Sequence, residues 1–151
     1  MPTLDSINDP YDLGRFIEAQ EQVYANVLAE LREGRKKTHW MWFIFPQLDG
    51  LGSSPTAKFY ALKDLVEARE YLRHPLLGKR LLECTELVLA VRGRTVTQIF
   101  VYPDDLKLRS SMTLFSCAAD PGCVFDEVLE RCFDGRRDGR TLGLLGHPAR
   151  E

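Results

Sequence analysis

Apolar residues at helical spacing recur along this chain, and they restrict its fold more than any other feature of the sequence. In the first such pattern, apolar side chains return every three or four residues, which places them on one face of an amphipathic helix. The members of that face are Leu13, Phe16, Ile17, Tyr24, Val27, Leu28 and Leu31. Gly34, followed by Arg35, Lys36 and Lys37, marks the expected end of this helix. Because the helix dipole favours cations at that end, these residues indicate either a solvated helix terminus or an anion site.

The same helical signals return through the rest of the chain. Longer helices are predicted for segments 64–74, 75–91, 104–118 and 121–133. The segment TVTQIFVY (95–102) is rich enough in β-branched and aromatic residues for a strand. Without a convincing second strand to pair with it, we expect an extended or short helical connection there. The sequence therefore predicts an all-α fold, a compact single-domain bundle of several short to medium helices. The domain spans residues 1–151, with its core in about 12–146.

Charge and hydropathy exclude several classes of partner. The chain has 151 residues, of which 28% are charged, and its net charge is −2, so no broad basic field is available for nucleic acid. Nucleic acid is therefore an unlikely main partner, although a single stacked base is compatible with this charge. The N-terminal MPTLDSINDPYDL has neither the charged nor the apolar region of a secretory signal, and no apolar run is long enough to span a bilayer. We expect a cytoplasmic protein with no membrane partner.

Metal and cofactor sites are poorly supported. The four cysteines, Cys84, Cys117, Cys123 and Cys132, form no CxxC pair, and the three histidines are scattered along the chain. These thiols are expected to be reduced and mostly buried. We predict neither a metal nor a cofactor.

The segment HWMWFIFPQ, residues 39–47, contains both tryptophans of the chain. At least one of Trp40 and Trp42 is expected in the core, and the other could form a stacking platform for a planar ring. His39 is either a packed core residue or the one side chain here suited to proton transfer at neutral pH, which makes it a tentative catalytic residue. Gln47 adds two donors and an acceptor at the edge of that platform.

A second group of candidate residues lies on the segment DDLKLRSSMTLF. Leu108, Met112 and Phe115 would share the core face of a helix there. Lys107 and Ser111 lie four residues apart on one flank of that face, where an ammonium and a hydroxyl can both donate to an anion. For this pair an anion site and a structural role are both open.

The other flank of the same helix favours structural roles. Arg109 is expected to form an ion pair with Asp105, four residues earlier. Ser110 points away from the apolar face and is expected to be exposed.

The glycine-containing loop GLGSS offers a possible anion contact. Ser53 or Ser54 before Pro55 is typical of a helix start, and it predicts a short helix through Phe59 and Tyr60. Backbone N–H groups at such a start can bind an anion. The motif is weak, because it lacks the lysine of a phosphate-binding P-loop and follows no strand.

Three segments resemble a known family. HWMWFIFPQLDGLGSS, YLRHPLLGKRL and DDLKLRSSMTLF occur in this order and at this spacing in the bacterial family known as domain of unknown function 1810, whose members are sometimes labelled calpastatin-like. The resemblance runs from about Leu13 to Leu145 and implies a mainly helical single domain whose role it leaves open. The calpastatin label does not fit, because this chain carries no disordered inhibitor repeat. One departure is FVYPDD, where relatives tend to carry a glycine before the acidic turn.

The leading functional hypothesis is a pocket for a small anionic ligand of nucleotide or ADP-ribose type, which the protein could also hydrolyse. The residues predicted to bind it are Trp40, Trp42, Gln47, Ser53, Ser54, Lys107 and Ser111. Hydrolysis would need His39, Asp49 or Asp105 to activate water, and whether the protein is an enzyme stays open. The alternative is a non-catalytic protein–protein interaction module that presents the Trp/Phe-rich segment to a protein partner or to a second copy of the chain. In a third reading, every aromatic residue is core.

Overall fold

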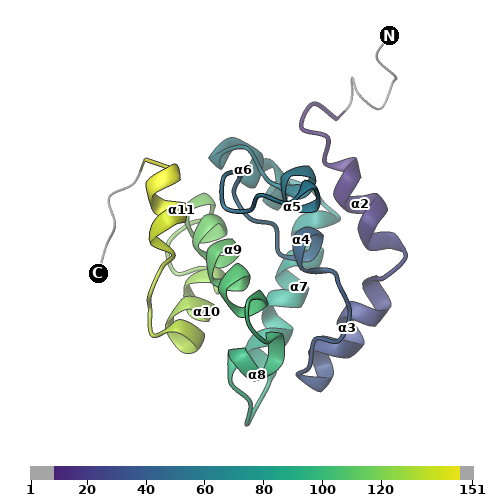
Figure 1. Ribbon diagram of the computed structural model, residues 1–151, viewed down its shortest axis with the longest axis vertical. Coiled ribbons are helices and arrows are strands. Elements are labelled where there is room, and N and C mark those ends of the chain that lie inside the picture. Colours follow the sequence, from purple (N-terminus) through teal and green to yellow (C-terminus); the bar gives the residue numbers. More distant parts are fainter. Residues whose placement is uncertain (1–8, 147–151) are drawn as a thin grey trace.

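The computed structural model describes residues 9–146, which form ten helices around one apolar core (Figure 1). In chain order these are α2 (Gly14–Glu21), α3 (Tyr24–Glu33), α4 (Met41–Ile44), α5 (Pro55–Tyr60), α6 (Leu65–Arg73), α7 (Leu77–Ala90), α8 (Val96–Phe100), α9 (Asp104–Ala118), α10 (Val124–Phe133) and α11 (Gly139–Leu144). The described part of the chain contains no strand, only an isolated bridge between Leu48 and Leu62. The predicted all-α fold is therefore confirmed.

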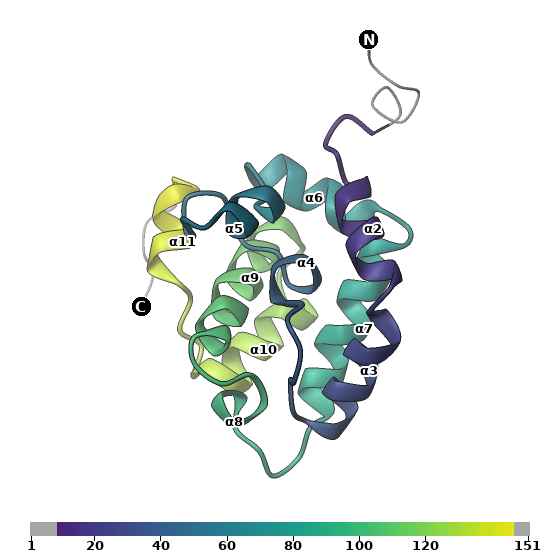
Figure 2. The same ribbon diagram turned by 45° about the vertical axis from the view of Figure 1, so that its right-hand side comes forward.

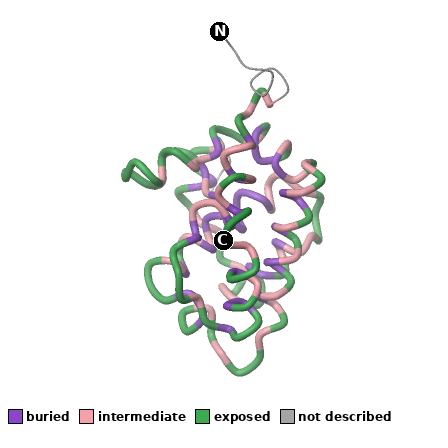
Figure 3. The backbone as a smooth tube through the Cα atoms, turned by 90° about the vertical axis from the view of Figure 1, so that its right-hand side faces the viewer, coloured by how far each residue is buried: buried purple, intermediate pink, exposed green. Residues whose placement is uncertain are grey.

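Helix α9 organises the packing. It contacts α4, α6, α8, α10 and α11, and Figure 2 shows it between α11 and α4. Buried residues lie along the inward sides of the helices, and the connecting loops are mostly exposed (Figure 3). Of the helices within residues 9–146, none has the length and apolar character needed to cross a membrane.

Several helix starts follow the local signals of the sequence. The Ser54 hydroxyl accepts a hydrogen bond from the backbone N–H of Ala57 at 3.1 Å, and Pro55 is the first residue of α5. The Asp64 carboxylate caps α6 in the same way at 3.0 Å. Before α7, Nδ1 of His74 accepts from two backbone N–H groups at 3.1 and 3.2 Å. His74 therefore has a structural role at a helix start.

The continuous helix suggested by the spacing from Leu13 to Leu31 is instead two helices. α2 packs against α4, whereas α3 packs against α7, and the chain changes direction between them at Gln22 and Val23. At the end of α2, the buried Gln20 donates to the carbonyl oxygen of Phe43 at 2.7 Å and to the Tyr71 hydroxyl at 3.1 Å. The helical spacing of the apolar residues continues across this break. Spacing alone cannot show that the two halves pack against different helices.

Val101 has a backbone conformation that L-residues rarely adopt. It follows α8 with φ 62° and ψ 146°, a region occupied almost only by glycine. The valine side chain is exposed, so no core packing offsets the strain. Val101 belongs to FVYPDD, the segment in which the resemblance suggests a glycine before the acidic turn, and its backbone is one that favours glycine.

Replacing Val101 by glycine is expected to stabilise the protein. Strain of this kind costs about 1–3 kcal/mol, whereas the added freedom of glycine in the unfolded chain costs roughly 0.5–1 kcal/mol. We expect a net gain of about 1 kcal/mol, or about 3 °C in Tm, measurable by thermal denaturation. Val66, an exposed valine in α6, is the control, and Val66→Gly should lose about 0.5 kcal/mol. Equal losses in the two variants would contradict the strain at Val101.

Candidate functional site

A cleft of about 480 Å³ lies between the loop that precedes α5, the first two turns of α9 and the start of α11. We call it the Trp42 cleft. Five of the seven predicted ligand-binding residues line it: Trp42, Gln47, Ser53, Ser54 and Lys107. Trp42 and Lys107 come from segments 65 residues apart in the sequence.

The wall contributed by α9 follows the helical period. Pro103, Leu106, Lys107 and Ser110 line the cleft, and their spacing of three, four and seven residues places them on one side of the helix. Lys107 Nζ lies 5.0 Å from the centroid of the Trp42 ring, within the range of a cation–π interaction. Trp42 itself is only half-buried.

Two lysines share one carboxylate beside the cleft. Asp104 Oδ2 is 2.8 Å from Lys36 Nζ, whereas Asp104 Oδ1 is 3.5 Å from Lys107 Nζ. Lys36 is the more buried of the two lysines, and its Nζ also lies 5.1 Å from the ring centroid of Trp40. One negative charge therefore faces two positive charges, and Lys107 is the less tightly paired lysine. This arrangement leaves positive charge at the cleft.

The opposite wall is built by the N-terminus of α11. Asp138 caps that helix and accepts from the Ser110 hydroxyl at 3.0 Å. Its own backbone N–H donates to Thr113 Oγ1 at 2.9 Å, which fixes α11 against α9. Arg140 adds a second cation and donates to the carbonyl oxygen of Gly50 at 3.3 Å. The expectation that Ser110 is exposed was wrong, because α11 covers it.

Two predicted ligand-binding residues do not reach the cleft. Trp40 is 1% exposed, and its indole N–H donates to Glu30 Oε1 at 2.9 Å, so it belongs to the core. Ser111 is fully buried, and its hydroxyl has no hydrogen-bond partner among residues 9–146. A spacing of four residues places Ser111 one turn beyond Lys107, where neighbouring helices already cover α9.

The residues proposed to activate water are also outside the cleft. His39 is exposed and does not line it, so the structure supports neither a core role nor a role at this site. Asp49 is exposed and lines a different pocket. Asp105 is buried and accepts from Thr97 Oγ1 at 3.0 Å.

The predicted ion pair between Arg109 and Asp105 is wrong. The guanidinium of Arg109 instead donates to the carbonyl oxygens of Arg136 and Arg137, each at 2.9 Å. The planar fork of arginine suits two neighbouring carbonyl oxygens, and it holds the loop between α10 and α11 against α9.

The Trp/Phe-rich segment is mostly core. Within it, Trp40, Met41, Ile44 and Phe45 are buried, while Trp42 and Phe43 are half-buried. The rings of Trp40, Phe45 and Phe100 pack together with centroids 6.0–6.3 Å apart. Trp42 is therefore the tryptophan that borders a cleft.

Glu30 fixes the loop that leads into this segment, a role that no pattern in the sequence indicates. Its Oε1 accepts from the backbone N–H groups of Lys37 at 2.6 Å and Thr38 at 3.0 Å, and from the Trp40 indole at 2.9 Å. Its Oε2 accepts from Thr38 Oγ1 at 2.7 Å. Burial alone would raise the pKa of Glu30, but these hydrogen bonds outweigh it and hold the pKa below its ordinary value.

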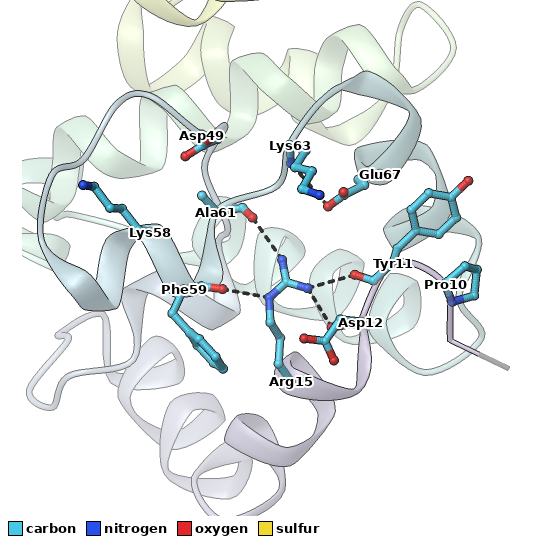
Figure 4. Close-up of a pocket in the computed structure, with 10 residues that line it drawn as sticks. All are labelled: Pro10, Tyr11, Asp12, Arg15, Asp49, Lys58, Phe59, Ala61, Lys63 and Glu67. Atoms are coloured by element: carbon cyan, nitrogen blue, oxygen red, sulfur yellow. Dashed lines mark hydrogen bonds between the residues drawn. The ribbon is translucent and has the colours of Figure 1, made fainter. Parts of the chain in front are cut away.

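A second pocket, of about 320 Å³, lies beside the start of α2 and the end of α5 (Figure 4). The cation at its centre, Arg15, already makes structural hydrogen bonds. The Arg15 guanidinium donates to the carbonyl oxygens of Tyr11, Asp12, Phe59 and Ala61 at 2.7–3.0 Å. Figure 4 shows these bonds converging on Arg15 while Lys58 points away from it. Arg15 therefore joins α2 to the chain around α5.

The thiols offer no activated nucleophile. Burial raises the pKa of Cys84 to about 12, and burial also raises the pKa of Cys117, Cys123 and Cys132. No group of three or more His, Cys, Asp or Glu side chains within residues 9–146 is arranged to hold a metal ion.

The chain is similar to known proteins over most of its length. A family model described as "Protein of unknown function (DUF1810)" matches residues 10–145. The crystal structure of the conserved hypothetical protein Rv1873 from Mycobacterium tuberculosis is 55% identical and has a TM-score of 0.90. That match covers 93% of this chain and 100% of the other. None of the curated proteins compared with the chain matches it.

Proposed function

This chain belongs to the DUF1810 family, and from that premise we propose that it binds a small anionic ligand of nucleotide or ADP-ribose type in the Trp42 cleft. The observation that carries the proposal is the position of Lys107, over the ring of half-buried Trp42 and only weakly paired with Asp104. A partly exposed indole and an incompletely neutralised ammonium together suit a planar ring joined to an anion.

The size and lining of the cleft support this class of ligand. Its volume of about 480 Å³ falls within the range common for small-molecule sites. Gln47, Ser53 and Ser54 supply donors and acceptors at one side, and Arg140 supplies a second cation at the other. Such a mixture of apolar and convergent polar groups fixes the orientation of a ligand.

The proposal is limited to binding. His39, Asp49 and Asp105 do not line the cleft, so none of them is in place to activate water there. Asp138 does line it, but this carboxylate already accepts bonds from Ser110 and from the first turn of α11. We therefore assign no hydrolytic step to these residues.

Lys107→Met is the variant that tests the site. Methionine keeps an apolar stem over Trp42 but removes the charge, so folding should be retained. AMP or ADP-ribose at about a hundred times its dissociation constant should stabilise the native protein by about 2.7 kcal/mol. This corresponds to about 5–10 °C in Tm. We expect the affinity of Lys107→Met to fall about tenfold or more, because a charge-assisted contact is lost.

Lys79→Met is the matched control, since Lys79 is exposed on α7 and does not line the cleft. Its ligand-induced shift should equal that of the wild type. The proposal fails if neither compound raises Tm, or if Lys107→Met binds as tightly as the wild type.

A further inference from the structure

Cations gather at one end of the molecule, although the net charge of the chain is −2. We call this group the cationic end: Arg32, Arg35, Lys37, Arg92 and Arg94. The first three lie at and just after the C-terminus of α3, and the other two follow α7. Both segments lie at the bottom of Figures 1 and 2, next to α8. The net charge of the whole chain does not reveal this cluster, because acidic residues elsewhere offset its positive charge.

Hydrogen bonds join the segment after α3 to the segment after α7 and to α8. Arg94 Nε donates to the carbonyl oxygen of Gly34 at 2.7 Å, and the backbone N–H of Lys36 donates to the carbonyl oxygen of Ile99 in α8 at 2.8 Å. Two acidic side chains lie close to Lys37: the carboxylate of Glu33 is 3.1 Å from its Nζ, and the carboxylate of Glu30 accepts from its backbone N–H at 2.6 Å. Among the residues described, no ion pair involves Arg32, Arg35 or Arg92, which are exposed.

The cationic end leads directly into the Trp42 cleft. Lys36, which follows Arg35, contacts the same Asp104 carboxylate as Lys107 of the cleft. In the sequence, Tyr102 lies between Ile99 and Asp104, both of which contact Lys36, and it is 71% exposed. The next residue, Pro103, lines the cleft. An exposed ring therefore lies in the chain segment that joins these contacts of Lys36 to the cleft.

We propose that the cationic end and the Trp42 cleft form one continuous site for single-stranded nucleic acid. This inference rests on the proposed function: the cleft holds one nucleotide of the strand, with its base at Trp42. The phosphates of adjoining nucleotides lie along the exposed cations of the cationic end, and Tyr102 offers a face for a neighbouring base. Sites of this kind combine a cationic track for the backbone with aromatic stacking platforms.

The aromatic residues favour a single strand over other polyanions. An acidic peptide offers carboxylates to the arginines but need not supply planar rings for Trp42 and Tyr102. In a duplex the bases are stacked on each other and are not available to side chains of this kind. The cations are also too few for a broad duplex-binding face, in agreement with the low overall charge.

Fluorescence anisotropy with labelled 12-nucleotide single strands, oligo(U) and oligo(dT), tests the inference on the full chain. At least one of them should bind about tenfold or more tightly than AMP. Its affinity should fall with salt, with a log–log slope of about −3 if about four phosphates are contacted. Tight binding of either strand supports the proposal.

The decisive variant is Arg35→Glu/Arg92→Glu, which reverses two exposed charges of the cationic end. It should weaken 12-mer binding about tenfold or more and leave AMP binding unchanged. The control, Arg69→Glu/Lys79→Glu, makes the same change in net charge at exposed positions of α6 and α7. At 0.15 M salt, charges far from the bound strand are screened. This control should therefore bind the 12-mer within about twofold of the wild type.

The remaining outcomes separate this inference from the function it rests on. If AMP binds through Lys107 but the 12-mer binds no tighter, the inference fails and the proposed function stands. Equal weakening by the two charge-reversal variants, equal binding of a duplex 12-mer, or equal competition by poly-glutamate would overturn the inference. So would 12-mer binding that is insensitive to Lys107→Met. If neither AMP, ADP-ribose nor the strands bind, both proposals fail.

Discussion

Replacing Gly78 by alanine is expected to destabilise the protein by about 3 kcal/mol, which is large for one methyl group. A Cβ atom on Gly78 would lie 2.1 Å from the backbone carbonyl oxygen of Leu72 and 3.0 Å from its carbonyl carbon. The obstacle is backbone, so no change of rotamer can relieve it. Helix α6 ends at Arg73 and α7 begins at Leu77, and the connection between them is too short for the helices to separate. Thermal and urea denaturation would measure the loss, expected as about 6–12 °C in Tm.

Gly143→Ala is the matched control, with an effect of opposite sign. Gly143 also lies within a helix, α11, but no atom comes within 4 Å of its added Cβ. Alanine there should stabilise the protein by up to about 1 kcal/mol, because glycine is the poorer helix former. A Gly78→Ala variant as stable as the wild type would contradict the close contact between Gly78 and the Leu72 backbone.

The helix pattern was predictable because its signals are local. Ser54 and Asp64 cap helices through bonds to backbone N–H groups only three residues away. The 104–118 segment forms a helix with the predicted bounds because its apolar face recurs at the helical period. In contrast, the requirement for glycine at position 78 depends on the path of a different helix. The helical pattern around Gly78 therefore does not show that a Cβ atom there would clash with the backbone of α6.

The candidate site was predictable only in part, for the same reason. Lys107 and Trp42 were recognised as polar or aromatic groups beside core positions, and the fold brings them together. Ser111 shares a flank with Lys107, but the flank is open for only the first turns of α9. Arg140 and Asp138 were missed, because they reach the cleft through a connection to α11 that no local pattern specifies.

Glu30 shows how a buried charge can be hidden in an amphipathic pattern. Its position near the end of α3 is typical of a solvated acid. Gly34 then takes up a left-handed conformation with φ 72°, and the chain turns back so that residues 37–40 lie over the carboxylate. The glycine signal marked the helix end correctly, but it could not show which side chain the returning loop would meet.

Removing the Glu30 carboxylate should therefore have a second large effect. In Glu30→Ala, the backbone N–H groups of Lys37 and Thr38 and the buried indole N–H of Trp40 lose their acceptor. Unpartnered buried donors are costly, and we expect a loss of about 3–4 kcal/mol, measured by urea denaturation. Glu33→Ala is the control on the same helix, because Glu33 makes only an exposed ion pair with Lys37 and should cost less than about 0.5 kcal/mol.

Glu30→Gln separates the charge from the shape of this contact, through its dependence on pH. The folded-state pKa of Glu30 lies below the unfolded value of 4.5, so the unfolded state takes up the proton first as pH falls. The stability that ionised Glu30 contributes is therefore complete above about pH 4.5 and is lost as pH falls through the folded pKa. Glutamine keeps an oxygen for the same donors but does not titrate, so its deficit relative to the wild type should shrink in acid. A deficit that stays constant from neutral pH down to about pH 3 would mean that the charge of Glu30 adds nothing to the stability of the loop.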